Sequence, residues 1–302
     1  MDVKSYVQAA RLRTLPLSVS GIIIGSFMSA SKGFFNWKIC LLALLTTIGF
    51  QIISNFANDY GDGVKGTDNE DRIGPERAVQ SGAISPKQMR NAIITSSIIT
   101  FLIAILLIFI AFGKDDFLNL IIFFCLGIAS IAAAIKYTVG KKAYGYSGFG
   151  DLFVFLFFGL VSVIGSYYLY SKQLSITLIL PAFSVGLLSI GVLNLNNMRD
   201  YHNDKSNNKV TLVVKIGVKR AKNYHFFLIG LAVSSFSILL AYTSLIYILG
   251  AIPLFVLIKH LIMVKNESNL RNLDGQLKIV ALTCFSSSLT YFIISLSNSF
   301  FS

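Results

Sequence analysis

The stretch NAIITSSIITFLIAILLIFIAFGKDDFLNLIIFFCLGIASIAAAIKY, residues 91–137, holds two apolar blocks, 92–112 and 117–136. Each is long enough to cross the hydrocarbon core of a bilayer, which takes about 20 residues of helix. Seven further blocks of similar length are 15–31, 39–58, 152–170, 174–195, 224–243, 245–264 and 278–299. All are apolar on every side, which excludes a large soluble core, whose helices keep a polar face for water. The chain is therefore predicted to be an all-α membrane protein, with about nine transmembrane helices in a bundle.

The composition supports this class of protein. Of the 302 residues, 54% are apolar and 13% are charged, whereas a soluble domain carries about 25% charged residues. The three cysteines, Cys40, Cys125 and Cys284, lie inside the blocks without paired spacing. This pattern argues against a disulfide or cysteine–metal framework. We expect residues 1–302 to form a single polytopic domain.

The basic residues behind the formal net charge of +12 are distributed unevenly among the loops between the blocks. If the N-terminus is cytoplasmic, the outer segments hold only Lys32, Lys38, Lys114 and Lys172, and the inner segments hold the other 22 of the 26 Lys and Arg residues. This asymmetry is the positive-inside rule of membrane proteins. It predicts a cytoplasmic N-terminus, and the charge then needs no nucleic acid to explain it.

Two inner segments are unusually rich in Asp and Asn. They are NFANDYGDGVKGTDNEDRIGPERAVQSG, residues 55–82, and NLNNMRDYHNDKSNNKVTLVVKIG, residues 194–217. Helical spacing of three or four places the polar residues of each segment on one face; they are Asn55, Asp59 and Asp62 in the first, and Asn196, Asp200 and Asp204 in the second. Solvated residues at the membrane edge are the plain alternative. Because both rows continue from asparagines inside the apolar blocks, where polar groups are costly, one shared functional site is favoured.

The residue types in these rows favour magnesium. Mg²⁺ prefers oxygen ligands and is usually held by one or two carboxylates together with substrate phosphates. Zinc would take His or Cys, and only His202 lies in either segment. Two facing Asp clusters therefore predict a diphosphate clamped through Mg²⁺. Cations on the same side of the membrane are Arg11, Lys65, Arg72, Arg77, Lys141, Lys142, Arg199 and Lys205. For each alone, an anchoring role under the positive-inside rule is an equal alternative.

A diphosphate clamp at the mouth of a central apolar cavity suits a substrate with a long apolar tail. Metal binding neutralises the charge that develops on a leaving diphosphate. An allylic carbocation remains, which has to be kept from water and which aromatic faces stabilise. Tyr137, Tyr144 and Tyr146, beside the polar loop after the fourth block, are the aromatic candidates.

These motifs resemble the UbiA superfamily of membrane aromatic prenyltransferases over nearly the whole chain. Its two signatures are similar to Asn58-Asp59-x-x-Asp62 and Asp200-x-x-x-Asp204. The stretches ARLRTLPLS, GPERAVQSG and YTVGKKAYGYSGFGDLFVFLFFG resemble the branch that prenylates 1,4-dihydroxy-2-naphthoate. One departure is Gly66, which stands where a third Asp is often found; the resemblance makes Asp68 its substitute.

The resemblance assigns roles to the candidate residues. It implies that Mg²⁺ is held by Asp59, Asp62, Asp68, Asp200 and Asp204. Together with the spacing, it implies a diphosphate-binding set of Arg11, Asn55, Asn58, Lys65, Arg77, Tyr137, Lys141, Asn196 and Lys205. Asp151, after the GYSGFG turn, is expected to position the acceptor or act as a base; a helix-start role near the positive end of the helix dipole is the alternative.

The expected reaction is Mg²⁺-dependent transfer of a polyprenyl group from polyprenyl diphosphate to 1,4-dihydroxy-2-naphthoate. Loss of CO₂ then gives demethylmenaquinone. The nearest alternative is another aromatic acceptor, such as 4-hydroxybenzoate or homogentisate. A transporter is a second alternative, but it would place its charges near the membrane midplane. A non-catalytic isoprenoid-binding protein is a third, and it would not need two Asp clusters.

Overall fold

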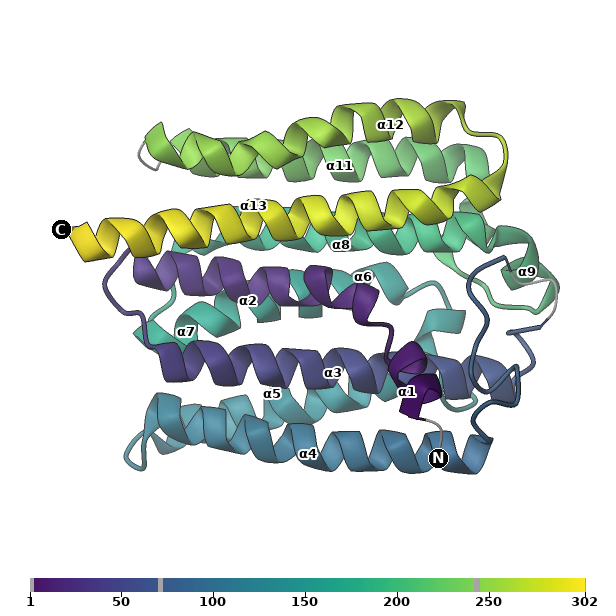
Figure 1. The fold of residues 1–302 in the computed structure, drawn as a ribbon, viewed down its shortest axis with the longest axis horizontal. Coiled ribbons are helices and arrows are strands. Elements are labelled where there is room, and N and C mark those ends of the chain that lie inside the picture. Colours follow the sequence, from purple (N-terminus) through teal and green to yellow (C-terminus); the bar gives the residue numbers. More distant parts are fainter. Residues whose placement is uncertain (1–2, 70–72, 242–244, 302) are drawn as a thin grey trace.

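A computed structural model of the chain describes residues 3–69, 73–241 and 245–301. All regular elements in these ranges are helices, and the long ones run side by side in one bundle (Figure 1). In chain order they are α1 (Val3–Ala10), η1 (Leu12–Thr14), α2 (Leu15–Ala30), α3 (Trp37–Val64), α4 (Pro86–Phe112), α5 (Phe117–Lys136), η2 (Tyr144–Tyr146), α6 (Gly150–Val154), η3 (Phe155–Gly165), α7 (Ser166–Ser171), η4 (Ile176–Leu178), α8 (Ile179–Arg199), α9 (Tyr201–Ser206), α10 (Leu212–Ile216), α11 (Val218–Ala241), η5 (Leu245–Phe255), α12 (Val256–Asn266), η6 (Leu270–Asn272) and α13 (Leu273–Phe301).

The predicted all-α membrane bundle is confirmed. Eight helical segments of the described residues are long and apolar enough to cross a membrane: Val3–Ala30, Trp37–Val64, Pro86–Phe112, Phe117–Lys136, Gly150–Ser171, Ile176–Arg199, Tyr247–Asn266 and Leu270–Ser297. They correspond to eight of the nine predicted blocks. The remaining block, 224–243, ends in residues that lie outside the described ranges, and α11 accounts for its described part.

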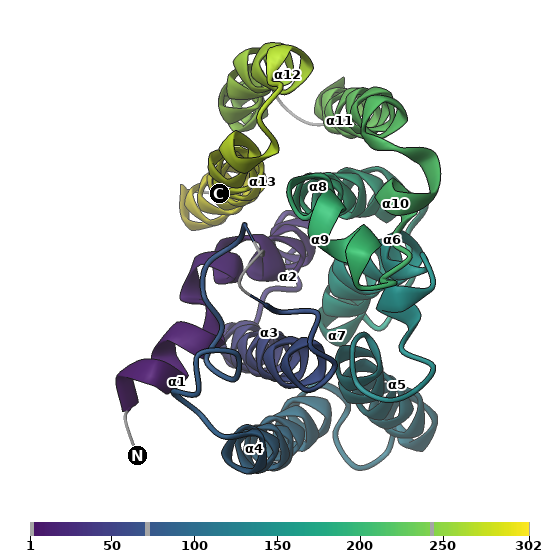
Figure 2. The ribbon, with the colours of Figure 1, turned by 90° about the vertical axis from the view of Figure 1, so that its right-hand side faces the viewer.

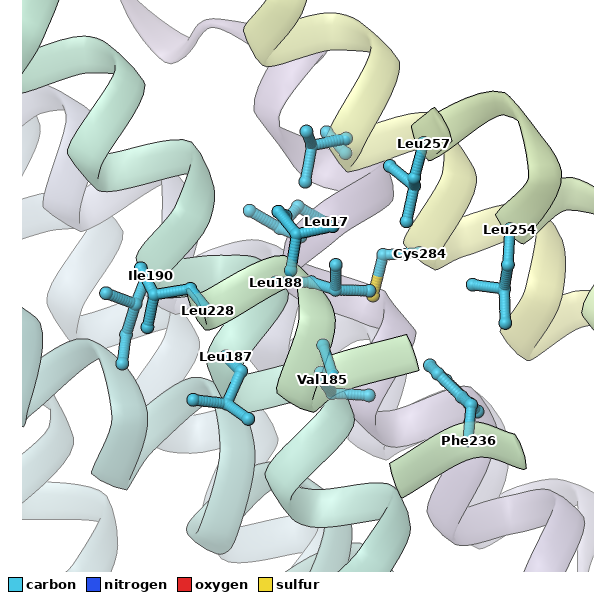
Figure 3. Packing of buried hydrophobic residues seen from close by; sticks show 14 of the residues in the cluster. Leu17, Val185, Leu187, Leu188, Ile190, Leu228, Phe236, Leu254, Leu257 and Cys284 are labelled. Carbon is cyan, nitrogen blue, oxygen red and sulfur yellow. The ribbon is translucent and has the colours of Figure 1, made fainter. Parts of the chain in front are cut away.

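The bundle has a packed side and a side with many exposed apolar residues. The largest buried cluster joins α2, α8, α11 and α13, where Leu17, Leu188 and Cys284 meet (Figure 3). By contrast, α5 has no fully buried residue, and large side chains such as Phe117 and Leu118 are exposed. Exposed apolar side chains of this extent suit contact with lipid. A helix can face lipid because its backbone N–H and C=O groups are hydrogen-bonded within the helix.

The segment 150–171 differs from the plain α-helix that its apolar sequence suggests. Residues Phe155–Gly165 form η3, a π-helix between α6 and α7. Its Gly159 faces Gly186 of α8 so closely that a Cβ on Gly159 would lie 2.9 Å from the Gly186 Cα and 2.7 Å from the Ala182 carbonyl oxygen. Small residues let membrane helices approach in this way, so backbone contact joins η3 to α8.

Both polar segments lie at the same end of the bundle. The loop after α3, helix α1 and helix α9 all lie towards the right-hand end in Figure 1, and they face the viewer in Figure 2. Arg11, at the junction between α1 and η1, has a left-handed backbone (φ 49°) that separates α1 from the axis of α2. The helices therefore gather polar residues from distant parts of the sequence over one mouth.

The contact between η3 and α8 gives a test of the packing. We expect Gly159→Ala to lower the stability of the detergent-solubilised protein by roughly 1–3 kcal/mol, since the new methyl group has no space. The matched change Gly230→Ala, on α11 where nothing lies within 4 Å of an added Cβ, is expected to leave stability unchanged or raise it, because Ala favours helix. Thermal unfolding measures both. Equal effects of the two changes would contradict the close contact.

Candidate active site

The bundle encloses a cavity of about 1120 Å³ with apolar walls and a polar mouth. The walls include Phe50 of α3, Phe123 of α5, and Phe157 of η3. At the mouth, the predicted site residues that line the cavity are Arg11, Asn55, Asn58, Asp59, Asp62, Asp68, Arg77, Tyr137, Asn196, Asp200 and Asp204. The apolar cavity and its polar rim thus agree with the sequence analysis.

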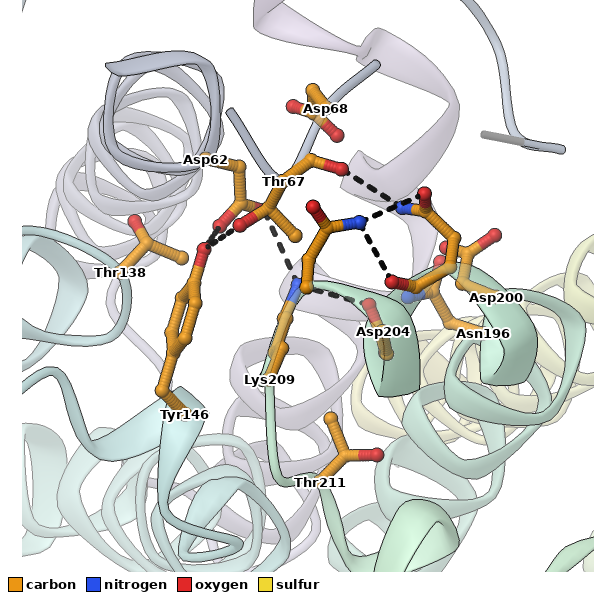
Figure 4. Close-up of polar contacts among 12 residues, drawn as sticks. Asp62, Thr67, Asp68, Thr138, Tyr146, Asn196, Asp200, Asp204, Lys209 and Thr211 are labelled. Atoms are coloured by element: carbon orange, nitrogen blue, oxygen red, sulfur yellow. Dashed lines mark hydrogen bonds and ion pairs between the residues drawn. The ribbon is translucent and has the colours of Figure 1, made fainter. Parts of the chain in front are cut away.

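The two polar segments meet at the ammonium group of Lys209 (Figure 4). Its Nζ lies 3.3 Å from Oδ2 of Asp62 and 3.7 Å from Oδ1 of Asp204, and all three side chains are almost inaccessible to solvent. The amide of Asn203 donates to the Thr67 carbonyl oxygen at 2.8 Å. Residues more than 130 positions apart in the sequence are therefore joined directly, as one shared site requires.

Lys209 was not among the predicted site residues, although it lies in the second segment. The chain leaves helix α9 after Ser206, and Asn208 takes a left-handed conformation (φ 55°). The Lys209 N–H then donates to the Asp204 carbonyl oxygen at 2.8 Å, which turns the lysine back over α9. Asn208, directly before the lysine, was the sequence signal for this turn, because Asn tolerates the left-handed conformation better than most residues.

The negative charges of Asp62 and Asp204 keep the Lys209 ammonium protonated. Burial on its own lowers the pKa of a lysine. The nearby carboxylates of Asp62 and Asp204 outweigh burial and hold the pKa of Lys209 well above its usual value. The structure therefore has a permanent cation between two carboxylates at the mouth of the cavity.

Tyr146 completes the surroundings of Asp62. Its hydroxyl donates to Oδ1 of Asp62 at 2.7 Å and lies 2.7 Å from the hydroxyl of Thr67. Burial, followed by the charge of Asp62, raises the pKa of Tyr146, so the phenol stays neutral and remains a donor. Lys65 packs behind this ring, with Nζ 3.9 Å from the ring centroid and 2.6 Å from the Thr138 carbonyl oxygen. Burial lowers the pKa of Lys65, and its side chain does not line the cavity.

Asp59 and Asn55 of the first segment form hydrogen bonds with backbone groups of neighbouring segments. The two carboxylate oxygens of Asp59 accept the backbone N–H groups of Ala78 and Val79, at 3.1 and 2.9 Å. This contact fixes the loop that carries Arg77. The amide of Asn55 donates to the Ala10 carbonyl oxygen at 2.8 Å, which fixes the bend between α1 and η1.

The second segment contains a buried arginine that forms a charge cluster. Arg199 is 1% exposed, and its Nε and Nη2 donate to the two oxygens of Asp200 at 2.8 and 2.7 Å. Nη2 also donates to Oδ1 of Asn196 at 2.8 Å, and Nη1 donates to Asp274 of α13. Asp274 lies outside both polar segments, so no local pattern pointed to it.

The other predicted residues are less closely involved. Arg77 pairs with Asp68 at 3.5 Å. Lys141 and Lys205 are exposed and do not line the cavity. Asp151 is also outside the lining; its Oδ2 accepts the Tyr224 hydroxyl at 2.9 Å, between α6 and α11. Arg72, named among the available cations, lies outside the described residues. Four of the cations and acids expected at the site, Lys65, Lys141, Lys205 and Asp151, thus do not line the cavity.

A run of aromatic rings leads from the mouth into the cavity. Tyr137 meets Tyr144 edge to face at 5.3 Å between ring centroids, Tyr144 stacks on Phe153 at 4.0 Å, and Phe153 stacks on Phe157 at 6.4 Å. All four rings line the cavity. The predicted tyrosines 137 and 144 are therefore part of a longer aromatic wall.

The chemistry of the mouth fits a divalent cation. Within the described residues, no three His, Cys, Asp or Glu side chains are grouped closely enough to hold a metal ion alone. Mg²⁺ seldom needs such a group, since it takes one or two carboxylates and completes its shell with phosphate oxygens and water. Asp62 and Asp204 already converge on a cation, the ammonium of Lys209. Carboxylates from both segments are therefore placed to share a positive charge.

Comparisons with known proteins identify similar chains. The profile of the UbiA prenyltransferase family matches residues 18–274. A 1,4-dihydroxy-2-naphthoate octaprenyltransferase of Haemophilus influenzae is 41% identical, with 93% of this chain and 92% of that protein covered. The Escherichia coli protein of the same name is 45% identical, with 74% and 71% covered.

Solved structures share the fold. A UbiA homolog from Archaeoglobus fulgidus bound to GPP and Mg²⁺ has a TM-score of 0.67 and 15% identity, with 97% of this chain and 99% of that chain covered. A UbiA homolog from Aeropyrum pernix K1 has a TM-score of 0.69 and 18% identity, with 95% and 99% covered.

The lysine between the carboxylates gives a prediction for stability. We expect Lys209→Met to destabilise the protein by about 3–5 kcal/mol in EDTA, because two buried carboxylates lose their partner. Mg²⁺ is expected to restore part of that loss, since the carboxylates then have another cation. Thermal unfolding with and without Mg²⁺ measures this. Lys219→Met, which replaces an exposed lysine on α11, serves as the control. A loss in Lys209→Met that Mg²⁺ does not reduce would argue against a cation site there.

Proposed function

Because the chain belongs to the UbiA prenyltransferase family, we propose that it transfers a polyprenyl group from a polyprenyl diphosphate to 1,4-dihydroxy-2-naphthoate. The diphosphate and the carboxylate of the acceptor, as CO₂, both leave, and the immediate product is the quinol form of demethylmenaquinone, since the step takes no oxidant. The observation that carries this proposal is the convergence of Asp62 and Asp204 on one cation at the mouth of a large apolar cavity. A charged head and a long apolar tail match that arrangement.

The diphosphate is bound at the mouth. Asp62 and Asp204 are the proposed first ligands of Mg²⁺, with Asp59, Asp68 and Asp200 beside them. Bound there, Mg²⁺ neutralises charge on the leaving diphosphate. Among the cations that line the cavity, Arg11, Arg77 and Lys209 are the proposed donors to diphosphate oxygens. The neutral hydroxyl of Tyr146 keeps Asp62 in place through its hydrogen bond.

The apolar part of the substrate occupies the cavity. Its walls exclude water from the allylic carbon once the carbon–oxygen bond to the diphosphate weakens. The rings of Tyr144, Phe153 and Phe157 lie along the wall next to the mouth. Aromatic faces attract cations, so these rings are the proposed stabilisers of the developing positive charge.

The choice of acceptor is supported by the relatives. Two bacterial proteins that share 41% and 45% identity with this chain carry the name of a naphthoate octaprenyltransferase. Another aromatic acceptor, such as 4-hydroxybenzoate or homogentisate, would use the same clamp and a differently shaped pocket. A transporter fits less well, because the acids lie at the ends of α3 and α8 and in α9.

We also propose that residues 1–302 form one domain in a bacterial cytoplasmic membrane, with the site on the cytoplasmic side. The excess of Lys and Arg in the segments at the polar end supports this orientation. The packing of α13 against α2 and α8, within one buried cluster, supports a single domain.

The reaction can be tested in membranes that contain the protein. Incubation with 1,4-dihydroxy-2-naphthoate, a polyprenyl diphosphate and Mg²⁺ is expected to yield the prenylated, decarboxylated product, detected by mass spectrometry. EDTA should abolish product. Parallel incubations with 4-hydroxybenzoate and homogentisate test the acceptor. Product from one of those acids alone would reject the naphthoate, and no product from any acceptor would reject prenyl transfer.

A further inference from the structure

The cavity reaches from the mouth to the opposite end of the bundle. Asp59, at the mouth, and Ala43 both line it. They lie 16 positions apart in α3, which is about 24 Å along a helix that rises about 1.5 Å per residue. The cavity therefore extends over most of a hydrocarbon core that is about 30 Å thick.

Packed side chains close the far end of the cavity. Four residues line the cavity and also belong to a buried cluster behind it: Ile22, Ala43, Leu107 and Leu169. Phe123 of α5 lines the cavity and packs against the same cluster. This end lies on the left in Figure 1, where α7 and the turn between α4 and α5 lie, opposite the mouth. These five side chains form the floor of the cavity.

Phe123 is held in the floor by aromatic neighbours on two other helices. Its ring centroid lies 4.9 Å from that of Phe112 in α4 and 5.7 Å from that of Tyr168 in α7, on which it stacks. The Tyr168 hydroxyl donates to Oδ1 of Asn119 at 3.0 Å, and the Asn119 amide donates to Asp116, the N-cap of α5, at 2.8 Å. The position of the Phe123 ring is therefore fixed from both sides.

One row of residues on α5 follows the cavity from the mouth to the floor. Its members recur every three or four positions, as one face of a helix requires; they are Phe123, Gly127, Ser130, Ala134 and Tyr137. Large rings stand at the two ends of the row, and small residues lie between them. A Cβ on Gly127 would meet nothing within 4 Å, so this position faces open space.

The length of this row can be compared with that of a prenyl tail. Phe123 and Gly127 lie 14 and 10 positions from Tyr137, or about 21 and 15 Å along the helix. An extended chain advances about 1.2 Å per bond, as an extended peptide does, and each prenyl unit adds about four bonds. The row therefore has room for about four extended prenyl units above Phe123 and about three above Gly127.

We propose that the prenyl tail lies along this row of α5 and that Phe123 determines how much of the tail the cavity holds in extended form. A tail of up to about four units fits above Phe123, and a longer tail has to bend there. Phe123 is therefore a specificity-determining residue for chain length. This inference rests on the proposed function, because it takes a polyprenyl diphosphate as the substrate.

A tail that left the cavity sideways into the bilayer makes a different prediction. Such a tail would pass neither Gly127 nor Phe123. A larger or smaller side chain at these positions would then have the same effect on substrates of every chain length.

The test uses Gly127→Phe in the purified full-length protein, with all-trans diphosphates of two, four and eight prenyl units and 1,4-dihydroxy-2-naphthoate as acceptor. The new ring fills the cavity about 15 Å from Tyr137, which a two-unit tail does not reach. We expect kcat/KM for the two-unit diphosphate to stay within about 3-fold of the wild type, and kcat/KM for the longer two to fall roughly 10-fold or more.

Two further variants and a binding readout complete the experiment. Phe123→Ala removes the ring from the floor and is expected to raise kcat/KM for eight units, relative to two units, roughly 3-fold or more. Gly230→Phe places the same ring on α11, outside the cavity, where an added Cβ meets nothing within 4 Å, and should leave the preference unchanged. The rise in unfolding temperature caused by each diphosphate gives the same comparison without turnover.

The possible results separate this inference from the proposed function. If Gly127→Phe shows the wild-type preference among the three lengths, the tail does not lie along α5, and an equal loss for all three lengths would overturn the inference as well. Either result leaves the proposed function intact, because the wild type still turns over. A wild-type protein that neither binds nor uses any of the three diphosphates would overturn the proposed function and this inference with it.

Discussion

Two buried carboxylates from distant parts of the chain, Asp62 and Asp204, share the ammonium of Lys209. Burying carboxylates together costs several kcal/mol per charge unless a cation compensates them. The turn at Asn208, which brings Lys209 back over α9, and the bond from Asn203 to the loop after α3 both serve this arrangement. The same requirement makes the mouth of the cavity receptive to another cation, because the carboxylates are already fixed around a positive charge.

The polar segments contain both residues that face a ligand and residues that hold the mouth together. Asp59 accepts two backbone N–H groups of the loop that carries Arg77, and Asn55 binds the bend before η1. Deep polar residues in a membrane protein are thus used to fix irregular backbone, which the bilayer tolerates only where protein satisfies it. Substitution of Asp59 therefore tests the loop as much as a metal ligand.

Local patterns in the sequence predicted the membrane spans and the two Asp clusters, because hydropathy and helical spacing depend on neighbouring residues. They failed where the chain leaves a helix or where partners are distant. Lys205 was among the predicted cations, but the turn after α9 brings Lys209 to the carboxylates instead. The pairing of Arg199 with Asp274 spans 75 positions and has no local signal. The π-helix at Phe155–Gly165 has the same apolar composition as an α-helix, so composition did not distinguish them.

We propose that the carboxylates of α3 and α9 act together on one bound cation and diphosphate. A double-mutant cycle of Asp62→Asn and Asp204→Asn, read out as the affinity for geranyl diphosphate with Mn²⁺ by calorimetry, tests it most directly. We expect a coupling energy of about 1 kcal/mol or more between the two positions, as residues that share a ligand show. Effects that add within about 0.5 kcal/mol, as for independent sites, would contradict it.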